Sequence, residues 1–387
     1  MSRFLILLLC AFLCFGARAS GDEALPFSID SLPREILSGP QSHGHVQGIV
    51  VDTANKAVYF SFTTFLLKTD FDGNPVGSVN GLTGHLGCLT FDRSTNRIYG
   101  SLEYKNDAIG KGILRNTSQE GATNRDGFYI AIFDASKIDR MDMDAEADSV
   151  MTTVYLREVV DDYLATVDAG GRTVEHRWGC SGIDGVTFAP APGSKNRDKL
   201  FLHVAYGIYA DTTRTDNDHQ VILAYDTRDW RRYETPLNQS RPHTNGPRRP
   251  AHKYFVYTGN TTYGIQNLAY DPHSGDWFAA VYKGIKPGMP NYDLFVVDGS
   301  AKAVKKNIAG SYEACKGELL SLKDAGLLDE TTGLRGWRFR YGATGICPVG
   351  DGYFYISQNY KIDRRQASRL RLYRWTGDAS SPFEEVE

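Results

Sequence analysis

The sequence has few cysteines, little net charge and none of the short motifs that mark familiar enzyme classes. Its 387 residues include six cysteines, none of them in a C-x-x-C pair, which argues against a zinc knuckle or a thioredoxin-type site. The 43 Lys and Arg residues nearly balance 46 Asp and Glu, giving a formal charge of −3. We therefore expect no nucleic-acid partner. A nucleophile elbow, an H-E-x-x-H helix, a Walker loop and a dinucleotide-binding glycine motif are also missing.

The only long apolar run lies at the start of the chain. Arg3 precedes the apolar residues 4–15, and Ala17-Arg18-Ala19 supplies a small-x-small cleavage pattern. Roughly twelve apolar residues are too few to span ~30 Å of hydrocarbon as a helix. We interpret residues 1–19 as a signal peptide and expect a secreted or periplasmic protein with no membrane in its mature form. Four cysteines then remain and allow three full pairings, which the sequence leaves open: Cys88, Cys180, Cys315 and Cys347.

Aromatic residues are abundant, with 22 Tyr and 19 Phe, as is typical of β-rich proteins. One strand pattern, a small or polar pair that runs into an apolar stretch, occurs five times. The five segments are Gln47–Asp52, Gly87–Asp92, Asp184–Phe188, Gln266–Asp271 and Thr344–Pro348. A pattern repeated in this way predicts a repeat architecture.

Each of the five segments is followed by further strand patterns. Second strands are predicted at Ala57–Phe62, Arg97–Tyr104, Leu200–Tyr206, Asp276–Tyr282 and Gly352–Gln358. Third strands are predicted at Phe65–Asp70, Phe128–Asp134, Gln220–Asp226, Asp293–Asp298 and Arg369–Trp375. Weaker fourth strands fit Pro75–Val79, Met151–Leu156, Arg232–Leu237, Ala303–Ile308 and Phe383–Val386. Helix-like spacing is confined to Arg157–Val167 and Cys315–Leu328.

Five rounds of four strands predict an all-β protein, a β-propeller of five four-stranded blades. We assign residues 43–387 to this single domain, after an N-terminal segment at 20–42. The uneven spacing leaves six or seven blades open, and a pair of β-sandwiches is the competing architecture. At the level of its blades, the chain resembles secreted β-propeller proteins. It lacks the Trp-Asp endings of WD-repeat propellers, the double-glycine strands of kelch propellers and the acidic metal ring of calcium-dependent lactonase propellers. No family's catalytic residues can therefore be transferred to this chain.

Aligning the five first strands places polar or small residues in one ring at the mouth of the central channel: Gln47, Gly87, Asp184, Gln266 and Thr344. Two positions earlier come His45 and His85, with glycine in the other three blades. The oxygens of Gln47, Asp184 and Gln266 could bind a hard cation such as Ca²⁺, and the sequence makes no cofactor certain. The alternative is that these groups fill the channel with hydrogen bonds and ordered water.

Long loops on the same face add further candidates. For catalysis they offer Tyr263 and Tyr341, beside the two histidines. For substrate binding they offer His176, Arg177, Tyr104, Lys283 and Arg340. Tyrosine rings stack on sugars and cationic groups neutralise carboxylate or sulfate, so this mixture favours an anionic, polyhydroxylated ligand.

The leading hypothesis is an exported, monomeric enzyme that acts on an acidic glycan by a lyase-like or hydrolytic reaction. In the lyase version His45 or His85 removes a proton next to a uronate carboxylate, and a tyrosine protonates the leaving oxygen. For hydrolysis, Glu103 and Asp184 are the candidate carboxylate pair. Two alternatives stay open: a non-catalytic propeller that binds a glycan or a protein, and a calcium-dependent phosphoester hydrolase.

Overall fold

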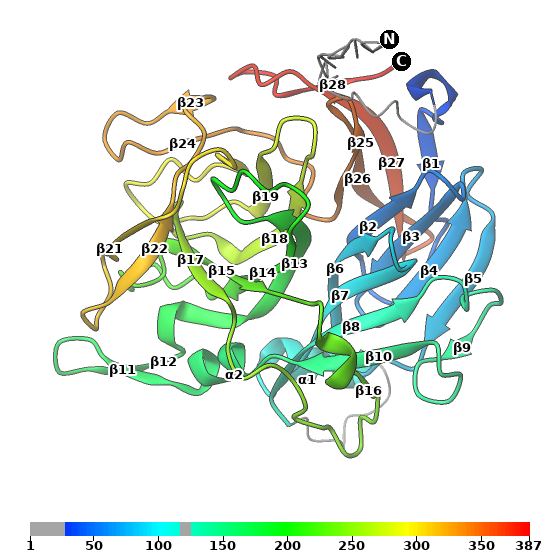
Figure 1. Cartoon of the computed structure of the whole chain (residues 1–387), viewed down its shortest axis with the longest axis horizontal. Coiled ribbons are helices and arrows are strands. Elements are labelled where there is room, and N and C mark those ends of the chain that lie inside the picture. The colour runs from blue at the N-terminus through cyan, green and yellow to red at the C-terminus, as the bar shows by residue number, and fades with distance from the viewer. Residues whose placement is uncertain (1–27, 117–124) are drawn as a thin grey trace, which may run out of the picture.

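The protein is an all-β, five-bladed propeller, in which five small sheets of antiparallel strands stand in a ring (Figure 1). The computed structural model describes residues 28–116 and 125–387, so the predicted signal peptide lies outside the described residues. No helix in the described part of the chain is long and apolar enough to cross a membrane. The chain runs round the ring from the blue blade 1 to the red blade 5, which lies beside it (Figure 1).

Each blade begins with the strand that faces the channel. Blade 1 contains β2 (Val46–Asp52), β3 (Ala57–Phe62), β4 (Phe65–Asp70) and β5 (Pro75–Asn80). Blade 2 contains β6 (His85–Asp92), β7 (Arg97–Tyr104), β8 (Gly127–Asp134) and β10 (Met151–Tyr155). Blade 3 contains β13 (Cys180–Pro190), β14 (Leu200–Ile208), β15 (His219–Tyr225) and β17 (His252–Tyr257). Blade 4 contains β18 (Thr262–Tyr270), β19 (Trp277–Tyr282) and β20 (Leu294–Val297), and blade 5 contains β25 (Ile346–Gly350), β26 (Tyr353–Ile362) and β27 (Arg365–Trp375).

Smaller elements extend these sheets or cross between them. The outer edges of blades 1 and 2 gain β9 (Met143–Asp144) and β16 (Thr235–Pro236), and blade 3 gains β22 (Lys316–Leu320) and β21 (Val304–Asn307). Two short hairpins are formed by β11 (Thr166–Asp168) with β12 (Thr173–Glu175) and by β23 (Leu327–Leu328) with β24 (Arg335–Gly336). The helices are α1 (Ala108–Asn116), α2 (Arg157–Leu164) and the 3₁₀ turns Ile29–Ser31, Arg177–Gly179 and Trp230–Arg232.

Aspartates end several first strands and build the tight turns that follow. The Asp52 carboxylate accepts the backbone N–H of Ala54 at 3.1 Å, and Asp92 accepts that of Ser94 at 3.0 Å. A side-chain oxygen that bonds the backbone two residues ahead stabilises a turn. These short connections all lie on the face opposite the one where the first strands begin, which leaves the longer loops on the other face.

Both ends of the chain complete blade 5. Strand β1 (Glu35–Leu37) pairs with the outer edge of β27 through Ile36 and Leu370, and β28 (Phe383–Glu385) pairs further along the same edge. A propeller closed by strands from both termini has few exposed edges. The sheet therefore uses residues 35–37, which precede the predicted domain start at 43.

Three of the weaker sequence predictions differ from the structure. The fourth strand of blade 3 is β17, not Arg232–Leu237, whose Thr235 pairs with β10 of blade 2 instead. The predicted strand at 303–308 forms β21 but joins the blade 3 sheet through β22. The predicted helix at 315–328 instead contains β22, because parallel pairing with β17 prevails over the helix-like spacing of its apolar residues.

All four described cysteines are free thiols, and Cys88 and Cys180 are buried. Aromatic packing instead holds neighbouring blades together. Phe278 of blade 4 lies 4.9 Å from Phe354 and 4.8 Å from Trp375 of blade 5, measured between ring centroids. Large buried aromatic side chains of this kind contribute strongly to stability.

Candidate functional site at the channel mouth

The first strands of four blades carry a β-bulge at the level of the predicted ring. The register shifts between Val46 and Gly48 in β2, and between Leu86 and Leu89 in β6. Corresponding shifts in β13 and β18 surround Asp184 and Gln266. Bulges are common beside functional sites because the extra residue redirects side chains. The ring residues therefore lie where the strands depart from regular pairing, at the mouth of the channel.

Asp184 is the central acid of this mouth. Its carboxylate accepts a hydrogen bond from Gln266 Nε2 at 2.9 Å, and its other oxygen lies 3.9 Å from His85 Nδ1. A Cβ at Gly207 would lie 2.9 Å from Asp184 Oδ2, so the absence of a side chain there leaves room for the carboxylate. Burial, together with the charge of Glu103, raises the pKa of Asp184 to about 7. Asp184 can therefore hold or release a proton near neutral pH.

Glu103, at the end of β7, is the second carboxylate of the cluster. It accepts the backbone N–H of Ile183 at 3.0 Å and forms an ion pair with Lys105 at 2.6 Å. His85 Nδ1 lies 3.5 Å from the same carboxylate. Burial alone would raise the pKa of Glu103, but the Lys105 ammonium and His85 hold it below its usual range. The two carboxylates thus flank one imidazole and have pKa values shifted in opposite directions, a pattern typical of acid–base sites.

Lys105 is held deep in the same cluster. Its ammonium donates to the carbonyl of Ser181 at 2.7 Å and lies 3.7 Å from the Asp107 carboxylate. Burial would lower the pKa of Lys105, but Glu103 and Asp107 raise it above its usual value. Lys105 therefore stays charged and acts within the protein, where it compensates the charge of Glu103.

His45 lies on the blade 1 side of the mouth, next to a tyrosine. The Tyr282 hydroxyl and His45 Nε2 are 3.3 Å apart. Burial, and then the neighbouring His85, lower the pKa of His45 to about 4. Burial also raises the pKa of Tyr282, to about 12, with a smaller effect from Asp184. At neutral pH the mouth therefore offers an uncharged imidazole that can accept a proton beside a protonated phenol.

The predicted calcium ligands Gln47, Asp184 and Gln266 take part in hydrogen bonds at the mouth. The Gln266 amide nitrogen donates to both Asp184 and the Tyr263 carbonyl, and the Gln47 amide nitrogen donates to the Thr63 hydroxyl at 3.3 Å. Within residues 28–116 and 125–387 no group of three or more His, Cys, Asp or Glu side chains is arranged to hold a metal ion. Calcium requires several converging oxygen ligands. The arrangement fits the alternative interpretation, in which the ring is filled by hydrogen bonds.

The channel is closed just below the ring by one side chain. Asn267 Nδ2 donates to the carbonyls of Gln47 at 2.8 Å and Ala343 at 2.9 Å, so it links blade 4 to blade 1 and to the segment that leads into blade 5. The equivalent residues of blades 1, 3 and 5 are glycines, and that of blade 2 is Cys88. At this level a Cβ on Gly48 would lie 2.7 Å from the Cα of Cys88, which shows how closely the strands approach.

Of the other predicted site residues, Tyr263 lies at the mouth. Its carbonyl accepts the Gln266 amide, its side chain is 42% exposed, and its φ of 64° is unusual for a residue other than glycine. Strained backbone of this kind is often found at functional sites. Tyr263 is thus available to contact a ligand at the mouth.

The remaining predicted substrate-binding residues lie outside the cluster or are engaged elsewhere. Tyr104 follows Glu103 on β7, so its side chain points to the opposite side of the strand, where its hydroxyl donates to Gln239. Arg177 pairs with Asp162 at 3.3 Å. His176 reaches the cluster only through other groups: its ring lies 5.1 Å from that of Tyr209, whose hydroxyl donates to Asp107.

Arg340, Tyr341 and Lys283 also lie away from the Asp184 cluster. The guanidinium of Arg340 stacks over the ring of Tyr341, with 4.6 Å between the guanidinium carbon and the ring centroid. Exposed Lys283 faces Asp293, whose pKa its charge lowers against the larger effect of burial. The structure thus brings together His45, His85, Asp184, Gln266 and Tyr263 and leaves the predicted cationic residues outside.

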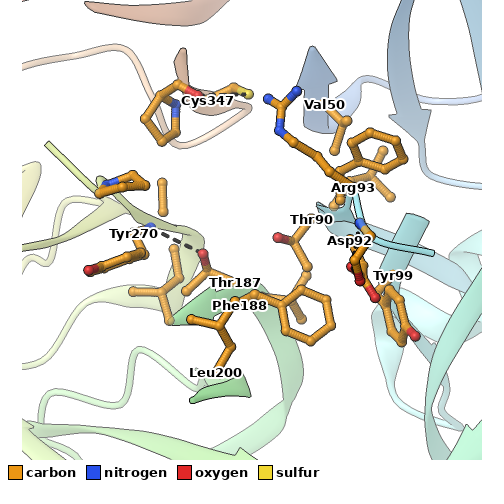
Figure 2. Close-up of a pocket in the computed structure, with 18 of the residues that line it drawn as sticks. Val50, Thr90, Asp92, Arg93, Tyr99, Thr187, Phe188, Leu200, Tyr270 and Cys347 are labelled. Atoms are coloured by element: carbon orange, nitrogen blue, oxygen red, sulfur yellow. Dashed lines mark hydrogen bonds between the residues drawn. The ribbon is translucent and has the colours of Figure 1, made fainter. Parts of the chain in front are cut away.

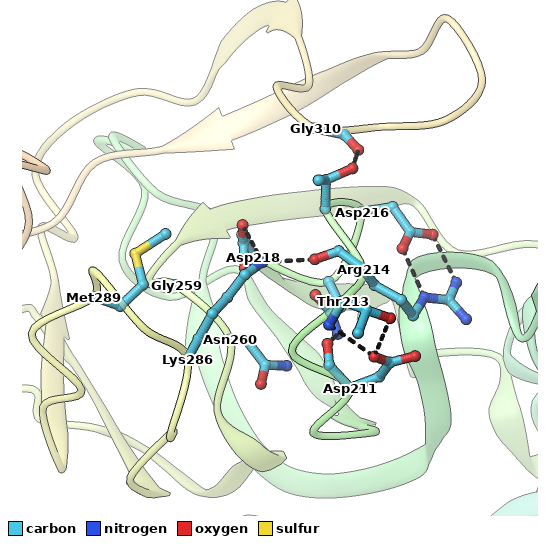
Figure 3. Close-up of polar contacts among 12 residues, drawn as sticks. Asp211, Thr213, Arg214, Asp216, Asp218, Gly259, Asn260, Lys286, Met289 and Gly310 are labelled. Carbon is cyan, nitrogen blue, oxygen red and sulfur yellow. Dashed lines mark hydrogen bonds and ion pairs between the residues drawn. The ribbon is translucent and has the colours of Figure 1, made fainter. Parts of the chain in front are cut away.

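Two other cations on the long-loop face, Arg214 and Lys286, form ion pairs. Figure 3 shows the loop between β14 and β15, where Arg214 binds Asp216 at 2.8 Å and Lys286 binds Asp218 at 2.7 Å. The Lys286 ammonium also donates to the carbonyl of Arg214, so it joins a loop of blade 4 to a loop of blade 3. These ion pairs fix the two loops, whereas Lys283 and Arg340 stay exposed on the same face.

Three residues that shape the mouth are not among the site residues predicted from the sequence, although two of them, Lys105 and Tyr282, follow second strands on the predicted long-loop face: Lys105, Tyr282 and Asn267. Lys105 and Tyr282 lie at the ends of second strands, where alternation alone does not tell which side chain faces the channel. A sequence signal exists for Asn267, because it is the one large polar residue in a row otherwise made of glycine and cysteine.

A large cavity opens on the opposite face. It is a funnel of about 1100 Å³, lined by the far ends of the first strands and by the short turns, and it includes none of His45, His85 or Asp184 (Figure 2). Cavity size alone would place a ligand there. The two carboxylates whose pKa values are shifted in opposite directions, Glu103 and Asp184, lie at the mouth instead, which favours that end of the channel for proton-transfer chemistry.

No protein-family model and no curated protein sequence matches the chain. Among solved structures, the holo form of the pyranose dehydrogenase PQQ domain from Coprinopsis cinerea is similar over 84% of this chain and 81% of its own, at 11% identity and a TM-score of 0.39. A structural genomics protein of unknown function from Bacteroides thetaiotaomicron is similar over 85% and 70%, at 10% identity and a TM-score of 0.34. Likenesses this distant carry no functional argument, so function has to be inferred from the site.

Proposed function

We propose that the protein is a carbohydrate-active hydrolase that uses the channel mouth for proton transfer. The observation that carries the proposal is the convergence of Asp184, His85 and Glu103, in which one carboxyl group is protonated near neutral pH and the other stays ionised. Oppositely tuned titratable groups in one site are a physical signature of acid–base catalysis.

In this proposal Asp184 is the general acid. Its proton passes to the glycosidic oxygen as the bond from that oxygen to the anomeric carbon breaks, and a water molecule attacks the anomeric carbon. The uncharged imidazole of His45 takes the proton lost by the water. Proton return from His45 to Asp184 then restores the starting state. Exposed Tyr263 would stack on a sugar ring beside them.

Glu103 and Lys105 are positioning residues. Glu103 is 4% exposed and already bonded to Ile183 and Lys105, so it is not available as a nucleophile. Its negative charge instead adds to the larger effect of burial in raising the pKa of Asp184. Within the Asp184 cluster, the charge balance also favours hydrolysis over a lyase reaction, because elimination from a uronate needs a cation beside the substrate carboxylate. Lys105, the cation found in the cluster, is engaged with Glu103.

The test is a screen of the mature protein against neutral and uronate-containing oligosaccharides. Hydrolysis releases new reducing ends without ultraviolet absorbance from unsaturated uronate. With an active substrate in hand, Asp184→Asn should lower kcat by about 10²- to 10⁴-fold, the usual contribution of a general acid. Asp92→Asn, which changes the same residue type in a turn on the opposite face, should leave kcat unchanged.

The pH profile separates catalysis from a structural role. A general acid must be protonated, so kcat should fall as the pH rises through about 7. His85 lowers the pKa of Asp184, so His85→Gln should move that fall to higher pH. A fall that does not move in His85→Gln contradicts the assignment. Unsaturated products would show the lyase reaction, and ligand retention without product in wild type and Asp184→Asn alike would show a binding protein.

A further inference from the structure

The funnel on the opposite face has a layered lining that the proposed hydrolase does not use. Its deepest layer comes from one position of all five first strands and is aliphatic throughout: Ile49, Leu89, Val186, Leu268 and Ile346. The layer nearer the opening comes from the following position of each first strand and contains smaller or more polar residues: Val50, Thr90, Thr187, Ala269 and Cys347. Polarity therefore increases from the closed end toward the opening.

The closed end is narrow. The Asn267 bridge and the close approach of Gly48 to Cys88 lie just beyond the aliphatic layer and separate the funnel from the mouth. A slender apolar group can enter such a blind end, whereas a folded protein surface cannot. Aromatic side chains, including Phe188 and Tyr270, line the funnel closer to the rim (Figure 2).

The rim carries an excess of positive charge. Six cationic side chains line the cavity, namely Arg93, Arg97, Arg197, Lys199, Arg228 and Arg231, against three acids, Asp92, Asp198 and Glu234. This local excess contrasts with the overall charge of −3. Positive charge concentrated around a low-dielectric cavity attracts anions.

Two of these arginines are placed to meet a ligand from opposite sides. The side chain of Arg93 is 52% exposed, and its guanidinium lies 3.9 Å from the Asp52 carboxylate. Arg93 extends toward Cys347 (Figure 2). Burial raises the pKa of the Cys347 thiol, and the charge of Arg93 lowers it by a smaller amount. Arg197 donates to the Tyr270 hydroxyl at 3.2 Å on the blade 3 and 4 side. No ion pair with a described residue involves Arg197.

We propose that the funnel binds a small anionic amphiphile. The apolar or aromatic body of the ligand occupies the aliphatic layer, and its carboxylate, sulfonate or phosphate lies at the rim between Arg93 and Arg197. The apolar blind end selects against a fully polar ligand, and the cationic rim selects against a cationic one. This site is separate from the channel mouth, so it does not depend on the hydrolase proposal.

The test uses 8-anilinonaphthalene-1-sulfonate, an anionic aromatic dye that fluoresces in apolar sites. Titration of the folded protein should show one saturable site. The double variant R93Q/R197Q should weaken dye binding about tenfold, the effect of losing two partly exposed charge contacts. The matched control R340Q/K283Q removes two exposed cations from the other face and should bind the dye as wild type does.

Competition identifies the ligand class. Octanoate should displace the dye, whereas octylammonium at the same concentration should not. Thr90→Phe, which fills the funnel from its small-residue layer, should abolish dye binding without changing the far-ultraviolet circular dichroism. Equal dye affinity in wild type and R93Q/R197Q, or equal displacement by octanoate and octylammonium, would overturn the proposal. Glycan turnover at the mouth should not change in R93Q/R197Q.

Discussion

Replacing Asp184 by Asn should stabilise the protein at neutral and alkaline pH, although it removes the proposed catalytic acid. The pKa of Asp184 is about 7 in the folded protein, against a usual value of 3.8. Each unit of difference corresponds to 1.36 kcal/mol, so the ionised carboxylate costs the fold up to about 4 kcal/mol. Asn cannot ionise, and the variant avoids this cost.

The pH dependence follows from the sign of the shift. Below pH 4 the carboxyl is protonated in both folded and unfolded chains, so Asp184 contributes no difference. Between about pH 4 and 7 the unfolded chain releases the proton more readily, and the wild type loses stability relative to Asp184→Asn. Above pH 7 the difference reaches its full value and stays constant.

The assay is urea denaturation of wild type and Asp184→Asn at several values between pH 4 and pH 8.5, followed by tryptophan fluorescence. We expect the difference in unfolding free energy to grow from about zero to between 2 and 4 kcal/mol in favour of the variant. Asp92→Asn serves as the control and should show no such growth. A difference that does not vary with pH, or a variant less stable than wild type at pH 8, would contradict a raised pKa of Asp184 in the folded protein.

Three further predictions concern the frame of the site. Gly182→Ala should destabilise the fold by about 3 kcal/mol or more in thermal unfolding, because Gly182 has a φ of 131° and a Cβ there would lie 1.9 Å from Glu103 Oε2. The control is Gly171→Ala, where φ is 89° and the space around the residue is open, and it should cost about 1 kcal/mol. Asn267→Ala should cost about 2–4 kcal/mol in urea denaturation, because two carbonyls lose their partner, and a loss below 0.5 kcal/mol would show that the bridge is dispensable. A chain that begins at residue 38 should be less stable than one that begins at 28 by about 3 kcal/mol or more, because it lacks β1 and the buried Ile36, and equal melting temperatures would contradict this.

The repeating first-strand pattern predicted the five blades correctly because the inner strands are set by local alternation and by turn residues such as Asp52 and Asp92. The outer strands were harder to predict. Residues 35–37 complete blade 5 from the opposite end of the chain, and β22 joins blade 3 after an excursion through blade 4. Such long-range pairings leave little local signal, since edge strands are short and their partners are far away in sequence.

Part of the candidate site could also be predicted from the sequence. Alignment of the first strands placed Asp184 and Gln266 in one ring and His45 and His85 two positions earlier, and the structure brings the four together at the mouth. The sequence could not show that Lys105 neutralises Glu103, because this pairing depends on which side of β7 faces the channel and on the loop that follows. Nor could it show that the predicted cations Arg177 and Arg340 contact neighbouring side chains instead.

The most direct test of the central claim, that Asp184 exchanges a proton near neutral pH, is a nuclear magnetic resonance titration of its side-chain carboxyl carbon. Protein labelled with ¹³C-aspartate would be titrated from pH 4 to pH 9, and the Asp184 signal assigned by its absence in Asp184→Asn. We expect a midpoint near 7. A midpoint at or below the usual value of 3.8 would contradict this expectation.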